Sequence, residues 1–289
     1  MNPFDFFKKM ETIHPQLAHA SNYLAKKVDR KTSSSQRRAL ETLAPTYQKY
    51  LYENLNLVGY SDEIVRQRVA LLNQYYDFIS EKGLDNVFSA QGKFRPTILE
   101  EFLFLLLKDY VADLSEKFDE AKVMGSGAIK AYSNIFFKSR DFPSFLKNPS
   151  IGINVKDQDY AIFRTFDLTV NNQSHKIAIP CVAAEAKTHI DKTMLDSIIA
   201  TAAKMKEGNP YTWFIAVAEY YDVNLDVDPA YSRIDQIYIL RKQKRRDIKS
   251  GRNPIDEKVV RILFSDIKKH LARPWSDIGS RLASDGLVL

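Results

Sequence analysis

One stretch of this sequence decides the fold: Ile177-Ala-Ile-Pro-Cys-Val-Ala-Ala-Glu-Ala-Lys187. It begins with an apolar, nearly uncharged run typical of a buried β-strand, and it ends with an anion and a cation two residues apart. Side chains alternate along a strand, so Glu185 and Lys187 point to one face and Ala186 points to the other. Burying two opposite charges in an apolar layer costs free energy, and a metal or a substrate is the usual reason for keeping them.

A second acidic segment lies upstream, in Lys156-Asp-Gln-Asp-Tyr-Ala-Ile-Phe163. Asp157 and Asp159 come just before another apolar strand, and 25 residues separate Asp159 from Glu185. An Asp followed by Glu-x-Lys has the form of a divalent-metal phosphodiesterase site. We prefer Asp159 because it directly precedes the apolar run, and Asp157 is the alternative.

A simple salt bridge at a strand end is the competing interpretation of Glu185 and Lys187. The same tripeptide occurs a second time, as Glu120-Ala-Lys122, and serves as a control for the motif. There it lies in a polar stretch typical of a solvated helix surface. Glu185 and Lys187 differ from that control because strand-compatible sequence leads into them.

The remaining pattern predicts an α/β fold with a mixed sheet, helices on both of its faces and an N-terminal helical region. Residues 1–90 carry apolar side chains at three- and four-residue steps, and we expect them to serve DNA recognition or dimerisation. Residues 91–289 are expected to form the catalytic domain. Pro180 cannot donate to a sheet ladder, so a bulge or break is expected there. Strands are predicted at 161–170, 176–187, 211–219 and 236–240, helices at 191–206 and 254–271, and an irregular connection at 121–150.

A helix that opens at Pro96 supplies a further candidate acid. It is apolar nearly all round, so it is expected to be buried. Glu100 and Glu101 interrupt it, and a surface position suits only one of them. We prefer Glu100 as the inward-pointing acid, which would bind a second ion or its water, and we keep Glu101 as the alternative.

These residue types suit phosphodiester hydrolysis by water. Mg²⁺ prefers oxygen ligands, and Asp159, Glu185 and the carbonyl of Ala186 could converge on one ion. That ion would polarise the scissile phosphate and lower the pKa of a bound water. Lys187 would orient or deprotonate the attacking water, or neutralise the developing negative charge.

Positive charge is concentrated rather than spread. The chain of 289 residues has 42 Lys and Arg against 36 Asp and Glu, and one segment, 241–252, accounts for a local excess equal to that of the whole chain. A solvated loop is the plain interpretation, and contact with DNA phosphates is the functional one. The candidate DNA-binding residues are Arg241, Lys242, Lys244, Arg245, Arg246, Lys249 and Arg252.

Other classes of chemistry find little support. Cys181 is the only cysteine, which excludes an intrachain disulfide and cysteine-rich zinc sites. The five histidines form no metal-type pair, and His189 is the least secure case because it lies two residues beyond Lys187. No membrane span or signal peptide is evident, so a cytoplasmic protein is expected.

The motifs together resemble the PD-(D/E)XK nuclease superfamily and, within it, the BbvCI-type, DdeI-related type II restriction endonucleases. The matching blocks run in order from about residue 96 to 271, and the first ninety residues match only in helical character. The blocks are Pro96–Phe102, Lys156–Tyr160, Ile179–Lys187, Met194–Asp196, Val217–Tyr220, Ile237–Arg241 and Asn253–Asp256.

This resemblance implies Mg²⁺-dependent cleavage of double-stranded DNA at a CCTNAGC-like site. It also implies that two related subunits each cut one strand, as a homodimer or a heterodimer. Asp159 and Glu185 would be metal ligands, Lys187 the catalytic lysine and Glu100 the helix acid. The alternatives are a repair or junction-resolving nuclease on the same core, and a DNA-binding partner subunit without catalysis of its own.

Overall fold

The computed structural model describes residues 2–88, 94–118, 124–147, 150–170, 173–273, 275 and 278–286. Its centre is a mixed sheet of five strands in the order β1-β2-β3-β4-β5. The first three strands pair antiparallel, and β3, β4 and β5 pair parallel. The predicted α/β fold is therefore confirmed. The strands are β1 (Met124–Lys138), β2 (Ser150–Val170), β3 (Gln173–Ile190), β4 (Trp213–Tyr221) and β5 (Gln236–Ile239).

Helices cover both faces of the sheet, as predicted. On one face α5 (Pro96–Lys117) and α8 (Glu257–Ala272) share a core with Tyr160, Ala184 and Ala186. On the other face α7 (Lys192–Gly208) packs on Ala183, Ala216 and their neighbours. The two cores follow the alternation of β3, because successive side chains leave a strand on opposite faces. Ala183, Glu185 and Lys187 therefore belong to the α7 side, and Ala184 and Ala186 to the α5 side.

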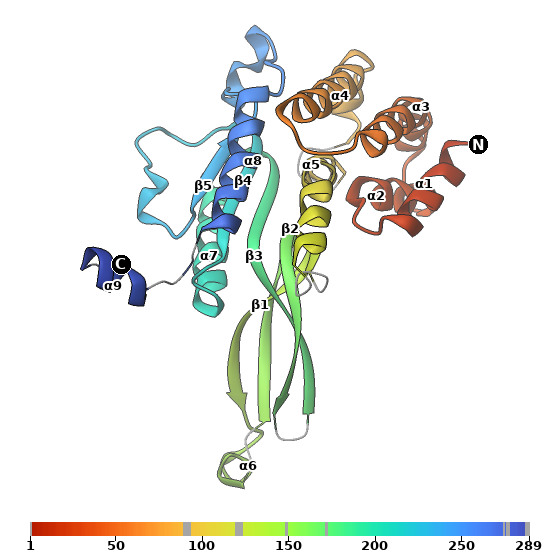
Figure 1. Cartoon of the computed structure of the whole chain (residues 1–289). Helices are drawn as coiled ribbons and strands as arrows, with labels where there is room; N and C mark the ends of the chain where they lie inside the picture. Colours follow the sequence, from red (N-terminus) through yellow and green to blue (C-terminus); the bar gives the residue numbers. More distant parts are fainter. Residues whose placement is uncertain are drawn as a thin grey trace.

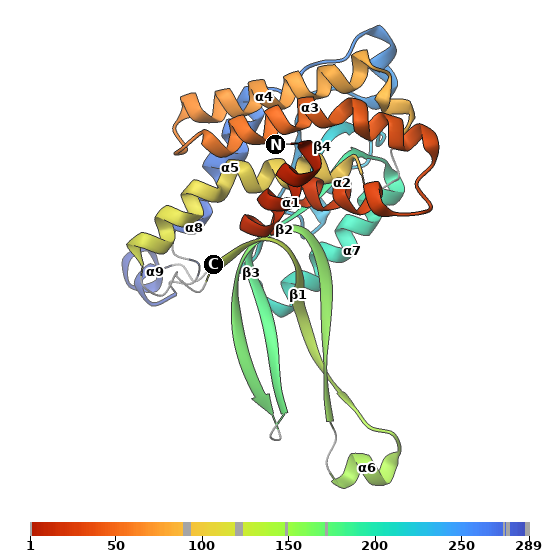
Figure 2. The same ribbon diagram turned by 90° about the vertical axis from the view of Figure 1, so that its right-hand side faces the viewer.

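The N-terminal region is helical, and it is joined to the sheet through α5. Its helices contribute to the same continuous core as α5 and the α5-facing side of the sheet. Figure 2 shows α3 and α4 lying side by side across α5. The apolar length of α5 is therefore explained by burial from two sides. These helices are α1 (Pro3–Ile13), α2 (Ala18–Val28), α3 (Ser34–Asn56) and α4 (Asp62–Glu81), followed by the short η1 (Leu84–Asn86).

Strands β1 to β3 continue beyond the body of the molecule as a long antiparallel arm (Figure 1). The short α6 (Phe142–Lys147) lies at its tip. At the opposite end, β3 passes into the body, where β4 joins it from Val182 onward. The remaining short elements are η3 (Pro229–Tyr231), η4 (Arg245–Ser250) and α9 (Ile278–Asp285).

The break predicted at Pro180 is a β-bulge. Ile162 pairs with Val182, whereas the next residue, Phe163, pairs with Pro180, so Cys181 is the extra residue on β3. The thiol of Cys181 donates to the carbonyl of Ile162 across the bulge, at 3.2 Å. The bulge separates the arm from the part of β3 that carries Glu185 and Lys187, and such irregularities commonly mark the approach to a site.

The prediction of an irregular connection at 121–150 is wrong, because much of it is β1. Gly125 and Gly127 suggested a loop, but both lie within the strand. A Cβ at Gly125 would come within 2.5 Å of the ring of Phe163 on β2, so the glycine allows that ring to lie against the β1 backbone. Glycine inside a strand marks such a close approach, and here it was mistaken for a break.

Within the part of the chain that the structure describes, no helix has the length and apolarity to cross a bilayer.

Candidate active site

Asp159 and Glu185 meet where β2 and β3 end their ladder. The last paired residues are Tyr160 and Ala184, so Asp159 and Glu185 are the next residues on each strand. The backbone N–H of Ala186 donates to Asp159 Oδ2 at 2.8 Å, which ties this carboxylate to β3 across the end of the ladder. Adjacent strands thus bring together two acids that the sequence separates widely.

Lys187 joins the two acids. Its Nζ donates to Asp159 Oδ2 at 2.9 Å and to Glu185 Oε2 at 2.7 Å. The side chains are 28% exposed for Asp159, 13% for Glu185 and 26% for Lys187. The group is therefore largely shielded from water but still open to a ligand.

Burial and the charge of Asp159 raise the pKa of Glu185, and Lys187 offsets only part of that rise. Burial lowers the pKa of Lys187, but the carboxylates of Asp159 and Glu185 raise it more, so the net shift is upward. The amine is consequently protonated at neutral pH, and two carboxylates share its single positive charge. One more cation would relieve this excess of negative charge.

The available donors fit a hard divalent cation. Asp159 and Glu185 offer carboxylate oxygens, and Ala186, which lies between Glu185 and Lys187 on β3, offers a backbone carbonyl. Mg²⁺ is usually held by one or two carboxylates, with waters and substrate phosphate as its other ligands. Among the described residues, no three or more His, Cys, Asp and Glu side chains gather as a metal-binding group.

The structure separates the two aspartates that the sequence left open. Asp157 is exposed, and its backbone lies opposite Lys130 of β1, beyond the end of the β2–β3 ladder. Asp159 contacts Ala186 and Lys187. The preferred residue is therefore the one that lies at the site.

The preference for Glu100 as the inward-pointing acid of α5 is wrong, because Glu101 is the fully buried one of the two. Glu101 is fully buried and accepts hydrogen bonds from the backbone N–H groups of His19 and Ala20, at 3.1 and 3.0 Å, and from the Tyr47 hydroxyl, at 2.9 Å. These donors fix α2 and α3 to α5, which is a structural role. Glu100 is partly buried on α5. Since α5 packs on the face opposite Glu185, a place for Glu100 in the metal site stays a prediction.

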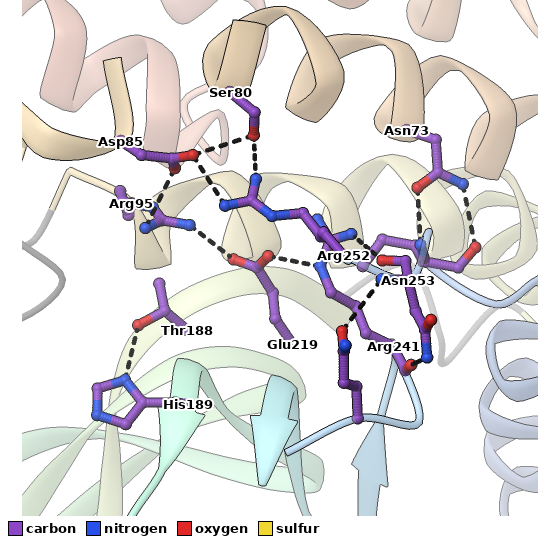
Figure 3. A network of polar contacts seen from close by, with 12 residues as sticks. Asn73, Ser80, Asp85, Arg95, Thr188, His189, Glu219, Arg241, Arg252 and Asn253 are labelled. Carbon is purple, nitrogen blue, oxygen red and sulfur yellow. Dashed lines mark hydrogen bonds and ion pairs between the residues drawn. The ribbon is translucent and has the colours of Figure 1, made fainter. Parts of the chain in front are cut away.

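The basic segment is anchored at both ends, as Figure 3 shows. Arg241 is 1% exposed, and its Nε donates to Glu219 Oε2 at 2.9 Å. Arg252 Nη2 donates to Asp85 Oδ2 at 2.8 Å. Arg95 lies between these pairs, 3.5 Å from Glu219 Oε1 and 3.3 Å from Asp85 Oδ1. We call these five residues the buried ion network.

The network changes the interpretation of the predicted DNA-binding residues. Arg241 and Arg252 are engaged by acids of the protein, and Arg241 is too deeply buried in this structure to reach a phosphate. Lys242 pairs with Asp256 at 2.5 Å, while Arg245 and Arg246 are exposed and Lys244 is partly so. The side chain of Lys249 lies outside the described residues, as does the control pair Glu120 and Lys122.

Sequence reasoning missed the acidic half of this network. Glu219 ends the apolar stretch of β4, as Glu185 ends that of β3, so the same signal was present. Asp85 and Arg95 lie in short polar connections, where no pattern distinguished them from surface charges.

Comparison with known proteins assigns the chain to a family. A family model described as Bpu10I restriction endonuclease matches residues 91–279, which is more than half of the chain. The chain belongs to the Bpu10I restriction endonuclease family. It is therefore a nuclease subunit of a type II restriction system, and the resemblance found in the sequence is confirmed. No curated protein matches it.

The fold has a counterpart among solved structures. A chain of the native BbvCI A2B2 tetramer, solved at low resolution, superimposes with a TM-score of 0.65 at 22% sequence identity. The match covers 88% of this chain and 97% of that one. At this identity the likeness speaks for the fold, and its extent means that at least part of the N-terminal helical region is included.

Proposed function

We propose that this restriction endonuclease subunit hydrolyses double-stranded DNA with Mg²⁺, at a CCTNAGC-like site. One observation carries the proposal: Lys187 Nζ lies within hydrogen-bonding distance of both Asp159 and Glu185, on the face of a strand inside the region that the family model matches. A simple salt bridge would need only one acid for this amine.

Each residue has a distinct role in the proposed reaction. Asp159, Glu185 and the carbonyl of Ala186 would hold the cation, with Glu100 as a candidate from α5. A divalent cation bound there would supply Lewis-acid chemistry: it would polarise the scissile phosphate and lower the pKa of a bound water. Lys187 keeps its proton beside the two acids, so its role is to donate to the phosphate and stabilise the charge that develops on it.

We propose that the chain acts with a second nuclease subunit, either a copy or a relative. One such site cuts one strand, so a duplex break needs two. The similar BbvCI chain comes from an A2B2 assembly. Residues 1–90 would serve DNA recognition or subunit contact, and Lys242, Lys244, Arg245 and Arg246 would contact the backbone.

The test is incubation of the chain with plasmid DNA and Mg²⁺, alone and with any related subunit encoded beside it. Discrete fragments or nicks that map to a CCTNAGC-like sequence are expected, and Lys187→Ala protein should give neither. Cleavage only at branched or damaged DNA would point to a repair enzyme. DNA binding without cleavage under all of these conditions would refute the proposal and leave a binding subunit.

A further inference from the structure

His189 connects the catalytic strand to the basic segment. It lies two residues beyond Lys187 on β3, so strand alternation puts both side chains on the same face, about 7 Å apart along the strand. Its side chain is only 6% exposed. Arg245 Nη1 donates to His189 Nε2 at 3.0 Å. An imidazole nitrogen that accepts this bond leaves the proton on Nδ1, which lies 3.3 Å from Thr188 Oγ1 (Figure 3).

Arg245 differs from the other cations of its segment. Arg241 and Arg252 are held by buried or half-buried acids, and Lys242 by Asp256. Arg246 is 71% exposed, and its recorded ion pair is a long contact of 3.9 Å with Asp247. Arg245 instead bonds to a neutral ring, which does not compensate its charge. The nearest acid to that ring nitrogen is Asp191, whose Oδ2 lies 3.9 Å from His189 Nε2, and among the described residues no acid forms an ion pair with Arg245 itself.

The segment that carries Arg245 is braced. Beyond the two buried anchors, Gln243 Nε2 donates to the carbonyl of Gly251 at 2.6 Å, and the carbonyl of Gln243 accepts from the N–H of Tyr221 at 3.2 Å. The segment is thus fixed to the end of β4 and closed on itself. Arg245 is preorganised beside the catalytic strand, which reduces the loss of conformational freedom on binding.

We infer that Arg245 grips the DNA phosphate next to the scissile one, and that His189 is the residue that positions it. This inference rests on the proposed function. The site has an excess of negative charge, so an incoming phosphate diester needs a cation close to Lys187. Arg245 supplies that cation on the same face of the sheet, and its planar guanidinium can bind a phosphate through two hydrogen bonds.

The test compares single-turnover cleavage by Arg245→Ala and Arg246→Ala with that of the wild-type protein, on the duplex that the plasmid assay identifies. At saturating DNA, Arg245→Ala should lower the cleavage rate about 10- to 100-fold, since a misplaced reacting group has effects of that order. Arg246→Ala should mainly weaken binding and reduce its salt dependence. Arg140→Ala, on the exposed arm, is the control for loss of a surface charge.

Two further variants test the positioning role. His189→Leu removes the acceptor and should reproduce the Arg245→Ala rate, whereas the amide oxygen of His189→Gln should restore most of it. The double variant with both His189→Leu and Arg245→Ala should cleave no more slowly than either single variant. Equal rates for Arg245→Ala and Arg246→Ala at saturating DNA would overturn the inference, as would a wild-type rate for His189→Leu.

A chemical change in the DNA gives a readout that does not depend on cleavage. We would replace the phosphate next to the cut by a neutral methylphosphonate. The wild-type protein should bind this modified duplex more weakly than the unmodified one, whereas Arg245→Ala should bind the two duplexes equally well. Equal weakening in both proteins would contradict the contact. Failure of the wild-type protein to cut any duplex would instead count against the proposed function, so the two failures are distinguishable.

Discussion

Two clusters of shielded charges lie toward the C-terminal ends of the neighbouring parallel strands β3 and β4, and they differ in charge balance and exposure. On β3, where its ladder with β2 ends, two carboxylates share one amine, and all three side chains remain partly open. At the end of β4, the buried ion network sets Glu219 and Asp85 against three arginines, and Glu219 and Arg241 are almost inaccessible. The cluster around Lys187 can therefore take another cation, whereas the buried ion network already holds more arginines than acids.

An acid at the end of an apolar strand sequence therefore does not by itself indicate a catalytic residue. Glu185 and Glu219 look alike in the sequence, but their partners give them opposite roles. Paired carboxylates with a shortage of cations fit a metal and a substrate. A carboxylate enclosed by arginines fits a structural joint, here between β4, the basic segment and the connection after α4.

The largest expected effect comes from the open cluster. Lys187→Ala should reduce the cleavage rate by about 10²–10⁴-fold, because it removes the cation that stabilises the developing charge. DNA binding should stay close to that of the wild-type protein in a gel-shift assay. Lys192→Ala, on the surface of α7 and paired with Asp196, is the matched control and should cleave normally. Unchanged cutting by Lys187→Ala would refute the site.

Changes in the buried ion network should instead affect stability. Glu219→Gln leaves the Arg241 guanidinium buried without its anion, which should lower the free energy of unfolding by about 3–5 kcal/mol. Urea denaturation measures this change. Glu257→Gln removes an exposed pair with Arg261 and should cost about 0.5 kcal/mol or less. Similar losses in the two variants would show that the network is not a structural joint.

Glu101 is a third kind of shielded acid, because it is buried and the hydrogen bonds it accepts come from neutral donors. Burial raises its pKa to about 7. Between the unfolded pKa, near 4.5, and about 7, the folded protein binds a proton that the unfolded chain has lost, so stability falls as pH rises through this window. Glu101→Gln should remove up to about 3 kcal/mol of that fall.

Denaturation curves between pH 5 and pH 8 check this expectation. The wild-type free energy of unfolding should decline more steeply with pH than that of Glu101→Gln. Parallel curves for the two proteins would mean that Glu101 ionises equally well when folded and unfolded.

Among the shielded acids, the smallest change in stability is expected for Glu185→Gln in the absence of divalent ions. Removing one of two close negative charges relieves repulsion that raises the pKa of Glu185, while Lys187 keeps Asp159 as its partner. The free energy of unfolding should change by about 1 kcal/mol or less. Activity should nevertheless be lost. A destabilisation as large as that of Glu219→Gln would erase the distinction between the two clusters.

Much of the fold and of the proposed site was predictable from the sequence. The β2–β3 hairpin, its bulge at Pro180 and the buried α5 follow from alternation, proline and apolar content. The structure places Asp159 against Ala186 and Lys187, as its position next to the apolar run suggested, and its role as a metal ligand stays a prediction.

The rest depended on contacts that no local pattern records. The glycines of β1 read as a loop, because the ring that covers Gly125 comes from another strand. The positive segment was read as uniform, but its end arginines are neutralised by Glu219 and Asp85, which are distant in sequence. The link between Arg245 and His189 also joins distant positions, so only the fold reveals it.

We propose that Asp159 and Glu185 share a divalent cation. The decisive experiment is anomalous diffraction from a crystal of the protein grown with duplex DNA and Mn²⁺, with Glu185→Gln as the comparison. We expect one strong peak between the two carboxylates, beside the amine of Lys187, that disappears in the variant. A Mn²⁺ peak bound elsewhere, with both carboxylates still paired only to Lys187, would contradict it.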